Sequence, residues 1–410
     1  MKKISILVVI TFLLVSTSPA FGKMPSFKAE NYPEFGDVLK RLKAIEVVES
    51  NGKKTFDKAS LEKRDYIRVL RLKGSPFEMG YQHGILLRKE ITKILKKRTK
   101  IESYFRGRKK KRTLKYIRQV ESLIPSEYLA EIKGMAAALN IDYDYILASR
   151  LIWELRKTGC TVVAASGAAT VDGNIIYLRS MENRPKTHTY LEIIVIIYEP
   201  DKGNSFVSIN GPVGIGVYSG MNEKHMTVDD NHVRSVKGDF RVDGIPLTLF
   251  RRMIIQNSNS MEEVQKFIES HIPSSSNNIT ITDGKTNEMR VYEVAGNKHR
   301  VRSPENGIMC STNHFIALDV DLKYKPKESQ KRYDLAVDQM KKRHGKIDSQ
   351  SLVKFSKSGF MSDRKRCVQQ YIVIMAPKNL DFWLAAQKRN NKQASKNNFV
   401  KFNLSEELKR

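Results

Sequence analysis

Cysteine, tryptophan and acidic residues are scarce in this chain of 410 residues. It has three cysteines and two tryptophans, and 44 Asp and Glu against 72 Lys and Arg give a formal net charge of +28. An odd number of cysteines excludes complete disulfide pairing within one chain. The eight histidines lack the close spacing of a metal site. We therefore expect at least one thiol outside any intrachain disulfide, and no metal or other cofactor.

The first residues predict export. Lys2 and Lys3 precede an apolar run from Ile4 to Val15, and small residues then lead to Gly22. This order is typical of a signal peptide, so we expect residues 1–22 to be removed and the mature protein to be periplasmic or secreted. The apolar run is shorter than the roughly 20 residues of a transmembrane helix, and no later segment is long and apolar enough. An uncleaved N-terminal anchor is the alternative.

Export bears on the cysteines and on the positive charge. In an oxidising compartment Cys310 and Cys367 could form a disulfide and leave Cys160 free, or all three could be buried thiols. The run from Arg106 to Arg112 concentrates basic residues. An exported chain meets anionic lipid or envelope polymer before nucleic acid, so we expect no nucleic-acid partner. The run is then a contact with an anionic membrane or envelope surface, or a solvated segment.

The spacing of apolar residues predicts an α+β domain. Residues 23–65 are polar with weak periodicity, and we expect them to form an extension on the surface of a single domain at 66–410. Helical spacing dominates before Cys160 and strand-like segments follow it. Helices are expected at 129–139, 143–155, 247–255 and 261–268, and strands at 66–72, 161–165, 175–178, 191–198, 205–209, 226–229, 278–282 and 289–294. Strands followed by helices and further strands indicate sheets covered by helices.

The tripeptide Gly159-Cys160-Thr161 predicts an internal nucleophile. The cysteine sulfur can attack the preceding peptide bond and convert the amide into a thioester that water hydrolyses. Glycine before it leaves this attack unobstructed and tolerates a strained backbone. Cleavage would give Cys160 an α-amine with a pKa of about 7.7, which suits a general base beside the thiol. We expect cleavage between Gly159 and Cys160 into associated chains, 23–159 and 160–410.

From about Tyr66 to its end, the chain resembles the acyl-coenzyme A:6-aminopenicillanic acid acyltransferase family. That family is also classed as C45 peptidases, within the N-terminal nucleophile hydrolases. The landmarks occur in the family's order: Glu78-Met79-Gly80 with Gly84, Glu131 to Ala136, Gly159-Cys160-Thr161, Gly220 to Glu223, Asp283-Gly284, Ser311 to His314, and Ser329 with Arg332. The resemblance implies a four-layer αββα sandwich of two stacked antiparallel sheets covered by helices.

The resemblance also implies roles for several residues. Cys160 would be acylated by a small-molecule N-acyl amide or acyl donor, and Asn313 would stabilise the oxyanion. Thr161 could donate through its backbone or hydroxyl, or be an ordinary strand residue. Arg332 would touch substrate, and Ser329 keeps a hydroxyl where the family often has another arginine.

The chain departs from the family directly after the nucleophile strand. The family usually carries Arg-Asn-x-Asp where this chain has Arg179-Ser180-Met181-Glu182. Glu182 keeps a carboxylate, one methylene longer, that could orient the α-amine or bind a polar substrate group. Arg179 would contact substrate, and a surface salt bridge between Arg179 and Glu182 is the alternative.

Together these features predict a self-processing cysteine amidohydrolase or acyltransferase that works through an acyl-Cys160 intermediate. One alternative is a catalytically retired, cationic envelope-binding protein on the same fold. Another is an uncleaved cysteine hydrolase that uses His314 as its base.

Overall fold

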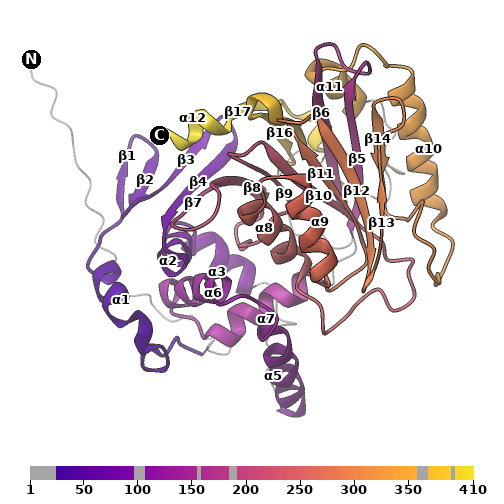
Figure 1. The fold of residues 1–410 in the computed structure, drawn as a ribbon. Coiled ribbons are helices and arrows are strands. Elements are labelled where there is room, and N and C mark those ends of the chain that lie inside the picture. The colour runs from indigo at the N-terminus through magenta and orange to yellow at the C-terminus, as the bar shows by residue number, and fades with distance from the viewer. Residues whose placement is uncertain (1–24, 97–106, 155–157, 184–191, 358–367, 389–392) are drawn as a thin grey trace, which may run out of the picture.

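The computed structural model describes residues 25–96, 107–154, 158–183, 192–357, 368–388 and 393–410. The predicted signal peptide and Cys367 lie outside these residues. Figure 1 shows two sheets face to face, with most helices against one of them and α10 and α11 against the other. The described residues contain no helix that is both long and apolar enough to cross a membrane.

The larger sheet has 11 strands. Its neighbours run antiparallel except for the parallel pair β4 and β7. In spatial order the strands are β1 (Val48–Ser50), β2 (Lys53–Phe56), β3 (Ala59–Arg64), β4 (Ile67–Gly74), β7 (Ile194–Pro200), β8 (Phe206–Asn210), β9 (Ser219–Asn222), β10 (Met226–His232), β11 (Asn277–Asp283), β12 (Glu288–Ala295) and β13 (Lys298–Arg302).

The smaller sheet has six strands, and all of its neighbours are antiparallel. In spatial order they are β14 (Ile308–Ser311), β5 (Thr158–Gly167), β6 (Gly173–Asn183), β15 (Val368–Ala376), β16 (Asp381–Ala386) and β17 (Val400–Asn403). The α-helices of the described residues are α1 (Gly36–Lys43), α2 (Pro76–Leu86), α3 (Arg88–Lys96), α5 (Gly107–Glu121), α6 (Ser126–Leu139), α7 (Tyr143–Glu154), α8 (Leu247–Asn257), α9 (Met261–Ser270), α10 (Lys327–Lys341), α11 (Ser349–Lys357) and α12 (Leu404–Leu408). The expected helices and strands are therefore present.

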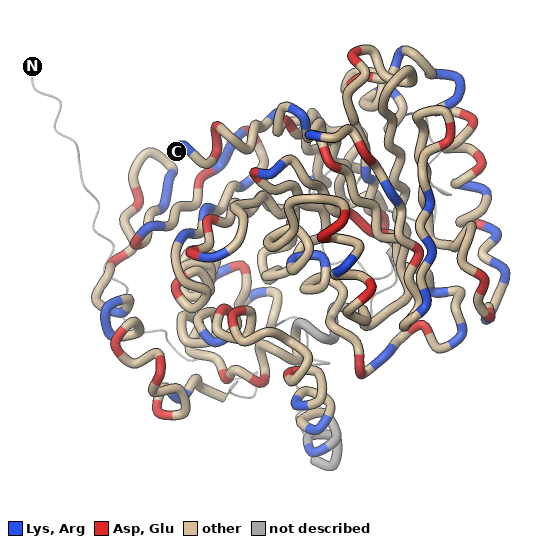
Figure 2. The backbone as a smooth tube through the Cα atoms, in the orientation of Figure 1, with Lys and Arg blue, Asp and Glu red and all other residues tan. Residues whose placement is uncertain are grey.

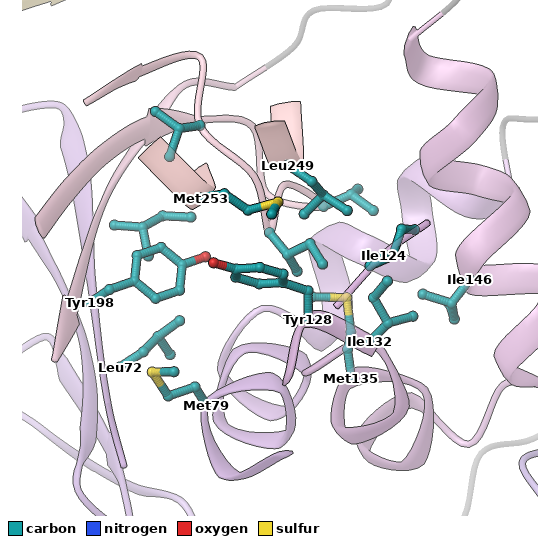
Figure 3. Packing of buried hydrophobic residues seen from close by; sticks show 14 of the residues in the cluster. Leu72, Met79, Ile124, Tyr128, Ile132, Met135, Ile146, Tyr198, Leu249 and Met253 are labelled. Carbon is teal, nitrogen blue, oxygen red and sulfur yellow. The ribbon is translucent and has the colours of Figure 1, made fainter. Parts of the chain in front are cut away.

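Three buried apolar clusters separate four layers. The first lies between the outer face of the larger sheet and the helices α1, α2, α3, α5, α6, α7, α8 and α9, and Figure 3 shows part of it around Tyr128 and Tyr198. The second lies between the two sheets and includes Cys160. The third joins the outer face of the smaller sheet to α10 and α11 through Met340 and Phe355. The predicted four-layer αββα sandwich is confirmed, with one parallel strand pair added to it.

Close packing of α2 on α6 depends on glycine. A Cβ at Gly80 would lie 1.9 Å from the carbonyl oxygen of Glu131, and one at Gly134 would lie 2.1 Å from that of Phe77. A Cβ at Gly84 would lie 2.6 Å from the Cβ of Ala138. None of these distances leaves room for a side chain, so the two helix backbones touch. The residues that match the family motifs here serve packing.

The structure corrects the expectation for residues 23–65. We expected an extension on the surface, but the described part of this segment forms α1 and adds β1, β2 and β3 to the edge of the larger sheet. Leu42 and Phe56 are fully buried in the core. The hairpin turn between β1 and β2 is Asn51-Gly52, with both residues at positive φ. Asn-Gly is a strong hairpin signal that apolar periodicity alone does not reveal.

Positive charge is spread over the described molecule. Figure 2 shows Lys and Arg on helices and strands alike, interspersed with Asp and Glu. Most of the basic run at 106–112 falls in the first turns of α5, which projects from the body in Figure 1. The other end of α5 is anchored in the core, where Ile117 and Val120 are buried.

Candidate active site

Cys160 lies in β5 with its thiol between the two sheets. Successive side chains of a strand point to opposite faces, and Cys160 belongs with Val162 to the cluster between the sheets, whereas Val163 faces α10 and α11. The residue is 1% exposed. The Gly159–Cys160 peptide bond is part of the ladder with β6, in which Gly159 pairs with Glu182. The predicted nucleophile is thus inside the sandwich.

Arg179 brings a positive charge to the thiol. It stands opposite Val162 on β6, so it shares the face of Cys160, and its Nη2 lies 3.4 Å from Sγ. Its guanidinium also contacts Asp229 Oδ1 at 2.8 Å and Asp230 Oδ1 at 3.0 Å, both from β10. Arg251 of α8 contacts the other oxygen of Asp230 at 2.7 Å. Two arginines and two carboxylates therefore form one buried network beside the sulfur.

The surroundings favour a protonated thiol. Burial raises the pKa of Cys160; Arg179 opposes this, and the carboxylates of Asp230 and Glu182 add to it. Burial also raises the pKa of Asp229 to about 7, although Arg179 opposes the shift. A protonated thiol needs a base before it can act as a nucleophile.

The backbone of Cys160 is held from a third side. Its N–H donates to Asn313 Oδ1 at 2.9 Å, and its carbonyl accepts from Arg332 Nη1 at 2.7 Å. Arg332 also donates to Thr161 Oγ1 at 2.9 Å and to Asn313 Oδ1 at 2.7 Å. The Nδ2 of Asn313 donates to the carbonyl of His232. In this uncleaved chain Asn313 faces Cys160 as an acceptor, whereas the sequence analysis gave it the role of an oxyanion donor.

Glu182 lies on the other face of the ladder. A Cβ built on Gly159 would be 3.6 Å from Glu182 Oε2, which places the carboxylate beside the bond expected to be cleaved. That contact distance is ordinary, and Gly159 has no left-handed φ. The φ of Gly159 does not itself require glycine, and the part that glycine plays in cleavage stays a prediction. Glycine here leaves space next to Glu182.

Two alternatives from the sequence are not supported. A surface salt bridge between Arg179 and Glu182 is wrong, because each residue is only 2% exposed and Arg179 pairs with Asp229 and Asp230. His314 does not share the thiol face. Its Nδ1 contacts Ser329 Oγ at 2.8 Å and Thr312 Oγ1 at 3.0 Å, and burial lowers its pKa.

Cys310 is a free, buried thiol in β14. Its side chain belongs to the cluster that faces α10 and α11. Burial raises its pKa to about 12, which makes it a poor nucleophile. Cys310 is thus a buried thiol in the part of the chain that the structure describes, and its pairing with Cys367 lies outside that part.

Asn231 is a buried polar residue that the sequence analysis did not select. It is 0% exposed, and its Oδ1 accepts from Ser311 Oγ. Ser311 pairs with Val162 in the ladder between β14 and β5, which brings Asn231 near β5. Nδ2 of Asn231 has no hydrogen-bond partner among the described residues. A buried amide without a hydrogen-bond partner costs folding free energy, so the position of Nδ2 favours a ligand or a reacting group as its partner.

The chain after Cys160 matches a known protein family. A family model described as acyl-coenzyme A:6-aminopenicillanic acid acyl-transferase matches residues 172–383, slightly more than half of the chain. The matched region contains Arg179, Glu182, Asn313 and Arg332.

Relatives are found in distant organisms. An "Uncharacterized protein" of Archaeoglobus fulgidus is 24% identical over 376 residues, with 76% of this chain and 62% of the relative covered. Protein dcd1B of Dictyostelium discoideum is 23% identical over 263 residues, with 58% of this chain and 52% of the relative covered. This chain thus spans less than two thirds of the length of either relative.

Similar solved structures are partial matches. A Caenorhabditis elegans ortholog of N-acylethanolamine-hydrolyzing acid amidase has a TM-score of 0.43 at 18% identity, covering 53% of this chain and 93% of that one. A mutant of conjugated bile acid hydrolase from Clostridium perfringens has a TM-score of 0.40 at 15% identity, covering 59% of this chain and 96% of that one.

Proposed function

The chain belongs to the acyl-coenzyme A:6-aminopenicillanic acid acyl-transferase family, and from this premise we propose that it is a self-processing cysteine amidohydrolase or acyltransferase. The observation that carries the proposal is the convergence on Cys160. Its sulfur, its N–H and its carbonyl are each contacted by a different side chain, Arg179, Asn313 and Arg332 respectively. Such fixation of a nucleophile on all sides is what a preorganised site requires.

The first reaction is cleavage of the chain. The sulfur of Cys160 attacks the carbonyl carbon of Gly159, and the C–N bond breaks as the C–S bond forms. The thiol proton goes to the departing nitrogen, which becomes the free α-amine of Cys160. Water then hydrolyses the thioester, leaving a carboxylate on Gly159 and returning the thiol. The pKa raised by burial keeps the thiol protonated until this step.

The second reaction is turnover of substrate. The α-amine of Cys160 takes the thiol proton while the sulfur attacks an acyl carbonyl. The substrate C–N bond breaks as the C–S bond forms, and the proton passes to the leaving amine. Water then hydrolyses the thioester, releasing the carboxylic acid and returning the thiol. Asn313 already accepts a hydrogen bond from this nitrogen and would hold the amine in place. The unpaired amide of Asn231 is the better candidate for stabilising the oxyanion.

The substrate class follows from the family and from the expected export. We propose a small-molecule N-acyl amide, with water as the acceptor, because acyl-coenzyme A is a cytosolic metabolite and the first 22 residues predict export. A periplasmic or secreted location belongs to this proposal.

Intact mass under reducing conditions tests the proposal. The wild type, Cys160→Ala and Cys310→Ala are purified in parallel, since Cys310 is also a buried free thiol and gives a matched control. We expect two chains from the wild type and from Cys310→Ala, with a new N-terminus at Cys160, and one chain from Cys160→Ala. A wild type that stays whole would overturn self-processing and favour the cationic binding protein.

A further inference from the structure

The segment from Thr312 to Leu318 joins β14 to the loop before α10 and carries Asn313. The pairing of β14 with β5 ends at Ser311 and Val162, two residues after Cys160. Beyond this point the side chain of Asn313, instead of a strand backbone, accepts the hydrogen bond of Cys160. The position of this segment therefore sets the position of the nucleophile's nitrogen.

Glu293 of β12 binds the far half of this segment. Its Oε1 accepts from the backbone N–H of Ile316 at 2.9 Å, and its Oε2 accepts from those of Ala317 at 2.8 Å and Leu318 at 2.7 Å. Arg302 of β13 adds a fourth contact, Nε to Oε1 at 2.7 Å. Glu293 is 0% exposed. Successive backbone amides around one anion form a nest, and a carboxylate fills it.

Asn278 binds the near half. It is the direct partner of Glu293 in the antiparallel ladder of β11 and β12, so both side chains lie on one face. Its Nδ2 donates to the carbonyl of Thr312 at 2.7 Å and to that of His314 at 2.8 Å. These two carbonyls flank Asn313. The cross-strand pair of Asn278 and Glu293 thus binds the segment on both sides of Asn313.

We propose that Glu293, together with Asn278, is a positioning residue for the reactions of Cys160; the inference rests on the proposed function. Hydrogen-bond satisfaction alone does not call for a buried carboxylate here, because Ile316 is 46% exposed and water could serve its amide. The carboxylate instead fixes where the segment lies. Arg332 approaches Asn313 from α10, so the hydrogen bonds that hold the segment also determine the contact between Asn313 and Arg332.

The test is Glu293→Gln. Both carboxylate oxygens face N–H donors, so the amide group of glutamine must turn a donor toward another donor. Glu288→Gln is the matched control, since Glu288 lies on the same strand and its contact with Arg290 is at the surface. The measurements are the rate of cleavage at 159–160, the hydrogen exchange of amides 316–318, and kcat and KM on an N-acyl amide.

We expect Glu293→Gln to slow cleavage by about tenfold or more, since misplacement of a reacting group by 1 Å can cost about 100-fold. Amides 316–318 should exchange faster, and kcat should fall with KM unchanged, because Glu293 acts through the segment that carries Asn313 and is given no contact with substrate. Cleavage within about twofold of wild type would overturn the inference, as would an equal loss in Glu288→Gln. Asn278→Ala carries the same test if Glu293→Gln does not fold. A wild type that is never cleaved removes the proposed function itself, and this outcome is distinguishable from the others.

Discussion

Two buried arginines sit in different layers of the sandwich and have different surroundings. Arg252 lies between the helices and the larger sheet, where Nη1 and Nη2 contact the two oxygens of Glu131 at 2.9 and 2.8 Å. Its guanidinium lies 4.2 Å from the ring centre of Tyr198 and 5.2 Å from that of Tyr128, and Figure 3 shows these rings pointing toward each other. Nη1 also donates to the carbonyl of Ile215, and Nε donates to Gln256 Oε1. The guanidinium of Arg252 is thus surrounded by one carboxylate, neutral oxygens and aromatic rings.

Arg179 lies between the sheets, and its guanidinium contacts two carboxylates and a cysteine sulfur. Its Nη1 reaches a carboxylate, the hydroxyls of Ser219 and Tyr371 and a carbonyl, while its Nη2 reaches Asp230 and the sulfur of Cys160. Both arginines are buried to the same extent, with Arg252 1% and Arg179 2% exposed. Burial therefore does not distinguish the two arginines. They differ in the groups that each guanidinium contacts, and only Arg179 contacts the sulfur of Cys160.

The largest expected effect is on stability, in Arg252→Met. The substitution leaves the carboxylate of Glu131 buried without its partner, which typically costs about 3 to 5 kcal/mol of unfolding free energy. The pair also joins α6 to α8, which lie on opposite sides of the predicted cleavage point, so separation of the two chains should become easier. Denaturant unfolding of the Cys160→Ala background measures the loss. The double variant Arg252→Met with Glu131→Met should recover most of it; no recovery would mean that the rings, not the charge pair, carry the effect.

The second effect is on chemistry, in Arg179→Gln. Glutamine keeps hydrogen-bond donors but removes the charge next to the sulfur, so we expect cleavage at 159–160 to slow by about 100-fold or more. Arg252→Gln, assayed at a temperature where both variants are folded, should cleave within a few-fold of wild type. Equal slowing in both variants would show that the two arginines do not differ in the way their contacts indicate.

The sequence predicted those parts of the site that local pattern encodes. The apolar run after Cys160 has strand character, and alternation alone puts Cys160 and Val162 on one face. The strand and helix segments after it were found for the same reason. The identities of Asn313 and Arg332 came from resemblance, and the structure brings both to the backbone of Cys160.

The other residues of the site could not be predicted, because their contacts depend on how strands that are far apart in the sequence pair and face one another. Asp229, Asp230 and Asn231 lie in a strand whose apolar alternation predicts only a core position. Their contacts appear when β10 is placed opposite β5 and β6, which brings Asp230 within 3.0 Å of Arg179, 51 residues earlier in the chain. Glu293 and Asn278 became a pair in the same way, through the ladder of β11 and β12. No short-range pattern signals such partners.

The smallest expected effect is on the pH dependence of the unfolding free energy, and it comes from Asp229. Burial raises the pKa of Asp229 from 3.8 to about 7, with Arg179 opposing and Asp230 adding to the shift. A carboxyl group whose folded-state pKa is raised stabilises the fold fully below its unfolded pKa, and this stability is lost as the pH rises through the folded pKa. In the Cys160→Ala background, the unfolding free energy should therefore fall by on the order of 1 to 4 kcal/mol between about pH 4 and pH 8 because of this group.

Asp229→Asn has no such titration, so its unfolding free energy should fall less over the same range. Glu131→Gln is the matched comparison, because Glu131 is equally buried but pairs with Arg252. If Asp229→Asn and the Cys160→Ala protein show the same pH dependence, Arg179 keeps the carboxylate of Asp229 ionised over this range. The two buried arginines would then not differ in the ionisation of their partners. If the dependence is lost, the layer between the sheets keeps a carboxyl group that changes charge near neutral pH, next to the sulfur.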